Sequence, residues 1–380
     1  MAKLPLSLYI HTPWCIKKCP YCDFNSHTLQ GQIPESAFLA ALLEDLSQEL
    51  KTVKNRTLES IFIGGGTPSL LSADFYRQLL SAIQTRIALA PDIEITLEAN
   101  PGTFEQAKFA AFREAGINRL SIGVQSFSAD HLQALGRIHD PNDAIRAVTL
   151  AQSVGFDNLN IDLMFALSGQ TLEQALHDLE VAVSLKPQHI SWYQLTIEPN
   201  TYFYKHPPLL PDDDSSWAMQ VKGKAYLEHT GFGNYEISAY ARAGYRARHN
   251  LNYWLFGDYL AIGPGAHGKI TQSDPFVVER YWKTRLPLDY LDSNKAYRAG
   301  SRKVTSGELA FEFMMNALRL TEGASWALFA ERTRLPPASV ATVMTDLTQK
   351  GLLQDNGQTF HPTEQGHQYL NFMLEKFLTD

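Results

Sequence analysis

Hydrophobic positions in the first 232 residues follow two alternating periods. Short runs rich in β-branched and aromatic residues are followed by longer stretches in which apolar residues recur every three or four positions, as in a helix. One helical stretch carries Phe38, Leu42, Leu43, Leu46 and Leu50. The runs predict six strands: Leu6–His11, Ser60–Gly64, Ile93–Glu98, Arg119–Gly123, Asn158–Leu163 and His189–Leu195. Strands that alternate with helices predict an α/β fold with a parallel sheet, and six consecutive units favour a partial (β/α)6 barrel.

The pattern changes twice further along the chain. Residues 233–300 are rich in aromatic side chains and poor in periodicity, which predicts short strands and loops that continue the edge of the sheet. Residues 301–380 again predict helices and one hairpin: helices at Leu309–Leu320, Trp326–Arg332 and Pro337–Lys350, a hairpin at Leu352–His361, and a last helix from Thr363. This order is typical of a winged-helix domain. We therefore expect three parts, 1–232, 233–300 and 301–380.

Composition and charge narrow the classes of partner. The 380-residue chain is 44% hydrophobic, which allows a large core, and its formal net charge is −7. Residues 301–380 hold 7 Lys and Arg against 9 Asp and Glu, a net of 7 − 9 = −2, so we expect no nucleic acid partner even for the winged-helix part. No apolar stretch approaches the roughly 18 residues of a membrane span. The segment before the first strand is too short for a targeting signal, and we expect a cytoplasmic protein that meets a membrane only through a partner.

All three cysteines lie in one window, at Cys15, Cys19 and Cys22. A disulfide with one spare thiol, or a zinc site completed by His11 or His27, would be alternative uses of such a set. Iron–sulfur clusters, however, are held by cysteine thiolates, normally four of them. Three thiolates at this spacing can each bind one iron of a cubane, so one corner would remain for an outside ligand. We therefore predict a metal site with an open iron corner.

Glycines and polar residues follow the predicted strands at their carboxyl ends. These segments are Gly64–Pro68, Glu98–Pro101, Gln125–Phe127 with Arg137 beyond it, and Asp162. Each feature alone is commonly a tight turn or a helix cap. In a barrel of parallel strands, however, the carboxyl ends form one rim, where active sites lie. We therefore expect these residues to form one site together with the cysteines.

The cysteine spacing CxxxCxxC, followed after the next strand by Gly64-Gly65-Gly66-Thr67-Pro68, closely resembles the radical S-adenosylmethionine (SAM) superfamily. Three further motifs narrow the resemblance: Tyr9-Ile10-His11, Ile122-Gly123-Val124-Gln125-Ser126-Phe127 and Asn160-Ile161-Asp162-Leu163. They are similar to the branch that contains the oxygen-independent coproporphyrinogen III dehydrogenases and the HemW-type haem chaperones. The resemblance covers nearly the whole chain.

This resemblance implies a role for each matching residue. Cys15, Cys19 and Cys22 would hold a [4Fe-4S] cluster whose fourth iron is chelated by the amine and carboxylate of SAM. Tyr9 would pack near the cluster and adenosine, and the amides of Gly65, Gly66 and Thr67 would approach the methionyl part. The remaining SAM contacts would come from Glu98 and Asp162 on the ribose or sulfonium, Gln125 on the nucleoside, and Arg137 on the methionyl carboxylate.

Two departures from the dehydrogenases and one further motif favour the chaperones within the branch. Phe24 stands where the dehydrogenases have a fourth cysteine, and about five residues precede the first strand where they carry an extension that encloses substrate. His249, Asn250 and Tyr253 match the HNxxY motif that the chaperones use for haem. The resemblance therefore implies a chaperone that binds haem and passes it to an apo-protein, such as a respiratory haem enzyme, with a homodimer as one mode of transfer. The alternatives are a coproporphyrinogen III dehydrogenase and a winged-helix regulator that senses the cluster.

Overall fold

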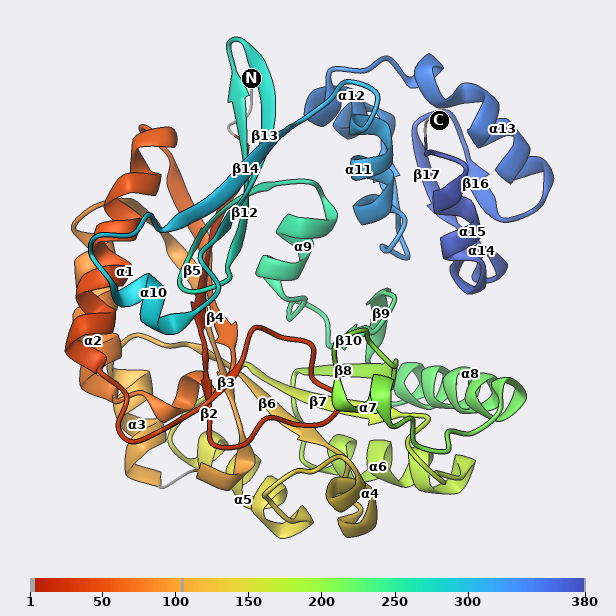
Figure 1. Cartoon of the computed structure of the whole chain (residues 1–380). Helices are drawn as coiled ribbons and strands as arrows, with labels where there is room; N and C mark the ends of the chain where they lie inside the picture. The colour runs from red at the N-terminus through yellow and green to blue at the C-terminus, as the bar shows by residue number, and fades with distance from the viewer. Residues whose placement is uncertain (1–3, 104–105, 379–380) are drawn as a thin grey trace.

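The computed structural model describes residues 4–103 and 106–378. In this part of the chain, twelve strands form one open sheet in the order β14-β13-β12-β11-β1-β4-β5-β6-β7-β8-β10-β9. Its central strands are parallel, and the strands toward both edges are antiparallel (Figure 1). The α/β architecture with six parallel units, predicted from the periodicity, is confirmed.

The six units occupy the chain up to α8. Their strands are β1 (Leu6–Thr12), β4 (Thr57–Gly65), β5 (Ala88–Ala99), β6 (Arg119–Gln125), β7 (Leu159–Phe165) and β8 (His189–Gln194). Their helices are α1 (Glu35–Glu49), α2 (Ala73–Gln84), α3 (Gln106–Glu114), α4 (Ala129–Ala134), α5 (Pro141–Ser153), α6 (Leu172–Ser184), α7 (Tyr202–Lys205) and α8 (Asp213–His229). Local sequence sets several helix starts. For example, α5 begins with Asp140 in a capping box and Pro141 in the first turn, and α6 begins with the Thr171 capping box.

Residues 233–300 extend the sheet on both sides. The strands β9 (Gly233–Glu236) and β10 (Ala239–Ala241) join the β8 edge. The other elements lie at the β1 edge: β11 (Asp258–Ile262), β12 (His267–Ser273), β13 (Phe276–Lys283), α10 (Pro287–Leu291) and β14 (Arg298–Val304). The strand β11 pairs with β1 in parallel, so it adds a seventh parallel strand that the periodicity did not predict.

One prediction for this segment is wrong. The stretch Arg248–Trp254 was expected to be strand or loop, but it forms the helix α9. Figure 1 shows α9 on the side of β4 and β5 that faces away from α1 and α2. The ring of His249 stacks on Phe62 of β4, with ring centroids 5.0 Å apart. Burial against the sheet therefore stabilises a short helix whose local sequence shows no clear helical period.

The two faces of the central sheet differ in chemistry. Leu8, Ile10 and Ile61 are fully buried in the main hydrophobic cluster, together with side chains of the covering helices such as Phe38 and Leu42. On the α9 face the buried side chains are largely polar: Ser7, Ser60, Thr96, Arg119, Asn160, His189 and His249. Such groups must find partners when they are buried, and hydrogen bonds such as that between Ser7 and Ser60 Oγ, 2.7 Å, link neighbouring strands.

The C-terminal part surrounds a second hydrophobic cluster that includes Phe313, Phe329 and Phe360. Its elements are α11 (Leu309–Ala317), β15 (Ala324–Ser325), α12 (Trp326–Thr333), α13 (Ala341–Gln349), β16 (Leu353–Asp355), β17 (Thr359–Pro362), α14 (Glu364–Gln368) and α15 (Leu370–Glu375). The predicted helices and hairpin are present, with two differences. A short strand, β15, pairs with the hairpin, and the last helix is divided at Tyr369. In the described residues no helix is long and apolar enough to cross a membrane.

Candidate functional site

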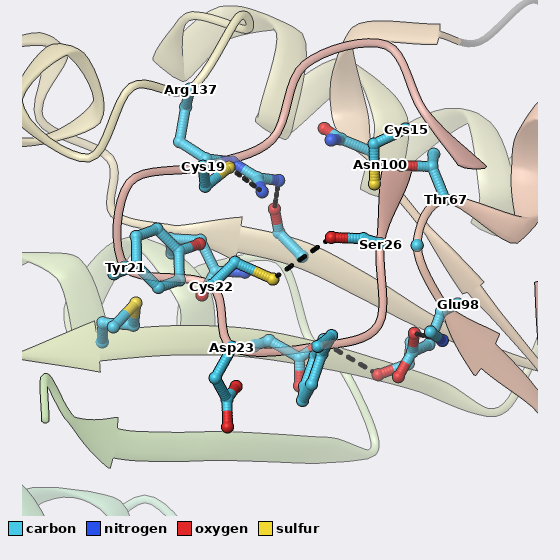
Figure 2. A pocket seen from close by; sticks show the side chains of 18 of the residues that line it. Cys15, Cys19, Tyr21, Cys22, Asp23, Ser26, Thr67, Glu98, Asn100 and Arg137 are labelled. Carbon is cyan, nitrogen blue, oxygen red and sulfur yellow. Dashed lines mark hydrogen bonds between the residues drawn. The ribbon is translucent and has the colours of Figure 1, made fainter. Parts of the chain in front are cut away.

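A cavity of about 390 Å³ lies at the carboxyl ends of β4 to β8, the rim predicted from the sequence. That volume is within the usual range for small-molecule sites. Ten predicted site residues line it: Cys15, Cys19, Cys22, Gly65, Gly66, Thr67, Glu98, Gln125, Arg137 and Asp162. Figure 2 shows the cysteine loop over one side of the cavity, with Thr67 and Glu98 approaching from the sheet. Four other predicted residues, Tyr9, His249, Asn250 and Tyr253, do not line this cavity.

The three thiols lie on a loop that is fixed at both ends. The segment β2 (Trp14–Cys15) pairs with β3 (His27–Thr28), and the Leu29 amide donates to the Cys15 carbonyl oxygen, 2.8 Å. All three cysteines are free thiols, Cys15 is buried, and burial raises the pKa of the Cys15 and Cys22 thiols. A positively charged iron–sulfur core would offset this by favouring the thiolate forms.

The three thiols lie around the cavity and do not converge on a single point. Among the described residues, no three His, Cys, Asp or Glu side chains are placed to hold a single metal ion. A cubane has a different requirement, because each thiolate binds a separate iron atom. Three thiols around a cavity with one open side therefore fit three corners of a [4Fe-4S] cluster better than they fit a tetrahedral zinc ion.

The glycine loop after β4 allows close packing against the cysteine segment. A Cβ added to Gly65, where φ is +113°, would lie 2.5 Å from the His11 ring, and one on Gly66 would lie 2.5 Å from the Trp14 carbonyl oxygen. In this structure the amides of Gly65, Gly66 and Thr67 donate hydrogen bonds within the protein. Gly65 donates to Glu98 Oε2 at 3.0 Å, Gly66 to the Thr12 carbonyl at 2.6 Å, and Thr67 to the Trp14 carbonyl at 2.7 Å.

Two half-buried carboxyl groups, those of Glu98 and Asp162, line the cavity. Burial, reinforced by the charge of Asp162, raises the pKa of Glu98 to about 7. Burial also raises the pKa of Asp162, although Ser121 Oγ and Asn160 Nδ2 donate hydrogen bonds to its carboxylate at 2.9 and 2.8 Å. A cationic or hydroxyl-bearing ligand would satisfy such a pair, since either stabilises buried negative charge.

Arg137 places positive charge beside the cysteines. Its Nη2 donates to the Gly123 carbonyl at 2.6 Å, its Nη1 lies 3.6 Å from Cys19 Sγ, and its buried Nε has no hydrogen-bond partner among the described residues. Gln125 lies between the two charged regions, and its Oε1 accepts from the Tyr193 hydroxyl at 2.7 Å. Figure 2 shows Arg137 and Glu98 on opposite sides of the cysteine side chains. The cavity therefore suits a ligand with a carboxylate at one end and a cationic, hydroxyl-bearing group at the other, as SAM has.

Tyr9 and the HNxxY residues lie in the interior of the sheet instead. The Tyr9 hydroxyl is 2.9 Å from His11 Nδ1, and the Tyr9 ring packs on Phe62 and His249. Tyr9, which was predicted to pack near the cluster and adenosine, is therefore not among the residues that line the cavity. Its hydroxyl instead fixes His11, whose other ring nitrogen is 2.9 Å from the Asn25 carbonyl oxygen in the cysteine loop.

His249 is 2% exposed and both of its ring nitrogens have partners. The Tyr253 hydroxyl is 2.6 Å from Nε2, and Ser60 Oγ is 3.4 Å from Nδ1. Burial and the charge of Arg119 lower the pKa of His249 to about 3, so the imidazole is neutral. Asn250 is half-buried and interacts with Tyr235. The neutral ring is the form that binds iron, but in this conformation it is not accessible to haem.

Sequence reasoning missed several residues that line the cavity, including Ser121, Tyr193 and Glu198. Ser121 could have been found from strand alternation, because residues 121 and 123 of β6 point to the same face. Tyr193 lies one residue before the end of β8, between Trp192 and Gln194, and no motif in this stretch marks it as a site residue. Glu198 lies beyond β8, in a segment without a recognisable motif.

Comparisons with known proteins agree with this geometry. The radical SAM superfamily model matches residues 9–182, and the HemN C-terminal domain model matches residues 304–369. The chain is 48% identical to heme chaperone HemW of Escherichia coli (strain K12), over 100% of both chains. It is 35% identical to heme chaperone HemW of Bacillus subtilis (strain 168), over 98% of this chain and 99% of that relative. The structure superposes on coproporphyrinogen III oxidase (HemN) from Escherichia coli with a TM-score of 0.82 and 21% identity, over 98% of this chain and 90% of that one, which shows a shared fold. The chain therefore belongs to the HemW family of the radical SAM superfamily.

Proposed function

We propose that this protein is a haem chaperone that binds haem and transfers it to an apo-protein acceptor. The observation that carries this proposal is the similarity to heme chaperone HemW over the full length of both chains. Phe24 supports it, because this exposed side chain lines the cavity at the position where the dehydrogenases carry a further cysteine. The acceptor, a respiratory haem enzyme for example, and a homodimer as the transferring species are part of the same proposal, as is a cytoplasmic location.

The cavity residues would hold the two cofactors of the superfamily. We propose that Cys15, Cys19 and Cys22 ligate a [4Fe-4S] cluster, that Arg137 pairs with the methionyl carboxylate of SAM, and that Glu98 and Asp162 meet its ribose or sulfonium. Gln125 would orient the nucleoside, and the close approach at Gly65, Gly66 and Thr67 would shape the wall beside it. In these positions, a bound and reduced cluster would supply an electron to the sulfonium of SAM. In a chaperone, the same pair of cofactors would set the conformation that accepts haem.

Haem transfer is the direct test of this function. When the anaerobically reconstituted protein is loaded with haem and mixed with a purified apo-form of a haem b protein, we expect the haem spectrum to change to that of the acceptor. The measurement is the visible absorption of the two proteins after separation. Haem that remains on the chain, or that reaches the acceptor no faster than free haem does, would contradict the proposal.

The dehydrogenase alternative has its own assay. The reduced protein would be incubated anaerobically with SAM and coproporphyrinogen III, and decarboxylated product would be measured. We expect none beyond background. Product formed at many turnovers per protein would replace the chaperone proposal by the enzymatic one.

We propose His249 as the haem ligand, with Asn250 and Tyr253 as its neighbours, although this requires α9 to release the ring. Replacement of Tyr253 by Phe removes the hydroxyl that occupies Nε2, so we expect about fivefold tighter haem binding, equivalent to one hydrogen bond of about 1 kcal/mol. His249→Ala should weaken binding by at least about tenfold. Both changes are measured by spectral titration with haem.

His189→Ala is the matched control for this test. His189 is also fully buried and also lies beside a tyrosine hydroxyl, that of Tyr235, 2.9 Å from Nε2. The His189→Ala variant should bind haem as the wild type does. If His249→Ala binds haem as tightly as the wild type, the ligand is another residue.

We also propose the division into 1–232, 233–300 and 301–380 as units of function. The separate hydrophobic clusters of the sheet and of the C-terminal part support it. The second cluster begins as early as Phe256, which indicates that the middle segment is packed against the C-terminal part.

A further inference from the structure

A second cavity, of about 350 Å³, lies at the opposite end of the sheet from the cysteines. Two of the residues that line it, Lys54 and Arg56, precede β4 at the amino ends of the parallel strands. Arg332 and Arg334 enter from the end of α12, and Thr271 and Ser273 belong to β12. The cavity therefore lies between the sheet and the C-terminal part, and no proposed cofactor contact uses it.

The cavity has an excess of positive charge. Four cationic side chains line it, against one carboxylate, Glu331. Arg56 is neutralised by Asp258, with Nη1 2.6 Å from Oδ2, and it also donates to the carbonyl oxygens of Leu4 and Pro5. Asp258 in turn pairs with the buried Lys269 at 3.0 Å. Asp258 is therefore shared between Arg56 and Lys269, and Glu331 is the only carboxylate that lines the cavity among the described residues.

Arg332 is the most informative of the four. It is 8% exposed, yet its buried Nε and Nη1 have no hydrogen-bond partner in the described part of the chain. The nearest carboxylate oxygen, Glu331 Oε1, is 3.6 Å from Nη1, which is beyond hydrogen-bond distance, and the Glu331 side chain is 42% exposed. Burial lowers the pKa of Arg332, although the charges of Glu331 and Asp258 act against this shift. Buried guanidinium donors are rarely left without an acceptor unless something else supplies one.

We propose that this basic pocket, formed by Lys54, Arg56, Arg332 and Arg334, binds a phosphate group, either free or carried on a small molecule. A guanidinium presents its N–H groups in a planar fork that matches two oxygens of a phosphate, and a dianion meets the excess charge. The hydroxyls of Thr271 and Ser273 line the same cavity and are able to contact a further oxygen. A bound anion would connect α12 to the strands of the sheet. The inference does not depend on the haem function.

Inorganic phosphate is the probe for this site. The full-length protein would be titrated with phosphate by isothermal calorimetry, in a buffer kept at constant ionic strength with chloride, and its thermal midpoint would be followed in parallel. We expect saturable binding to the wild type and at least tenfold weaker binding to Arg332→Gln, Lys54→Gln and Arg334→Gln. Arg77→Gln is the matched control, because Arg77 is an exposed arginine that pairs with Asp74 on α2. The Arg77→Gln variant should bind phosphate as the wild type does.

Lys54→Gln distinguishes ligand binding from a purely structural role. Lys54 is exposed, so the variant should fold even if Arg332→Gln does not. A structural role would change the thermal midpoint but not its dependence on phosphate. The proposal is overturned if the wild type shows no phosphate binding beyond the chloride background. It is also overturned if Lys54→Gln and Arg334→Gln bind phosphate as tightly as Arg77→Gln.

Discussion

Serine in place of Cys15, Cys19 or Cys22 is expected to abolish assembly of the [4Fe-4S] cluster. A serine hydroxyl is far harder to deprotonate at neutral pH than a cysteine thiol, and the deprotonated form is the metal ligand. Because the chain has only three cysteines, each variant retains two ligands for a cubane that already has one open corner. The measurement is the iron and acid-labile sulfide content after anaerobic reconstitution. We expect about four irons for each wild-type protein, as the cluster formula requires, and almost none for each variant.

Ser26→Ala provides the control for this experiment. Ser26 Oγ lies 3.8 Å from Cys22 Sγ, so the substitution changes the surroundings of a thiol without removing one. This variant should keep its iron. A wild-type protein that takes up one zinc and no sulfide, or a serine variant that retains four irons, would show that the assignment of the cysteines is wrong.

Replacement of Lys283 by Met is expected to cause the largest loss of stability. Lys283 is fully buried on β13 and pairs with Asp45 and Glu49 of α1, and Glu49 also pairs with Arg298. Burial already raises the pKa of Asp45 to about 6 with the ammonium present. Removal of the ammonium leaves two buried carboxylates against one cation, which destabilises the fold by about 3–5 kcal/mol. The decrease in the urea midpoint of the cofactor-free protein measures the effect.

An exposed ion pair is the matched control for Lys283. Lys295 pairs with Asp289 at 2.6 Å, and the two side chains are 49% and 34% exposed, so Lys295→Met should change the free energy of unfolding by at most about 1 kcal/mol. Asp45→Asn added to Lys283→Met should recover part of the loss, because it removes one uncompensated charge. Equal effects of the two lysine substitutions would contradict the proposed importance of the buried network.

The features that the sequence predicted correctly depend on local patterns. Each strand and helix of the six units has its own periodicity, and the carboxyl ends of parallel strands meet at one rim whatever the details of packing. The cavity with its cysteines and strand-end residues could therefore be predicted. The pairing of β11 with β1 could not, because it joins Asp258–Ile262 to Leu6–Ile10 and no local signal specifies such a distant partner. The ion network of Lys283 with α1 is distant in sequence for the same reason.

The HNxxY segment shows a different limit. Its residue types predicted a haem-binding motif, but they could not show that the segment is helical or that Tyr253 and Ser60 form hydrogen bonds with the imidazole nitrogens. Those contacts depend on tertiary packing of α9 against β4, which overrides weak local propensity. The glycine loop Gly64–Pro68 shows the same limit of prediction from sequence. Its composition predicted close approach, whereas only the folded structure shows that β1 and Glu98 accept hydrogen bonds from the Gly66 and Gly65 amides.

The late arrival of β11 has a consequence for biosynthesis. As the nascent chain leaves the ribosome, β1 can pair with β4 early, but its other edge stays without hydrogen-bond partners until Asp258–Ile262 has been translated. At usual elongation rates this delay is on the order of 10–50 s. An unpaired edge is a template for association with other chains. The interval between translation of the two strands is therefore when the growing polypeptide is most exposed to aggregation.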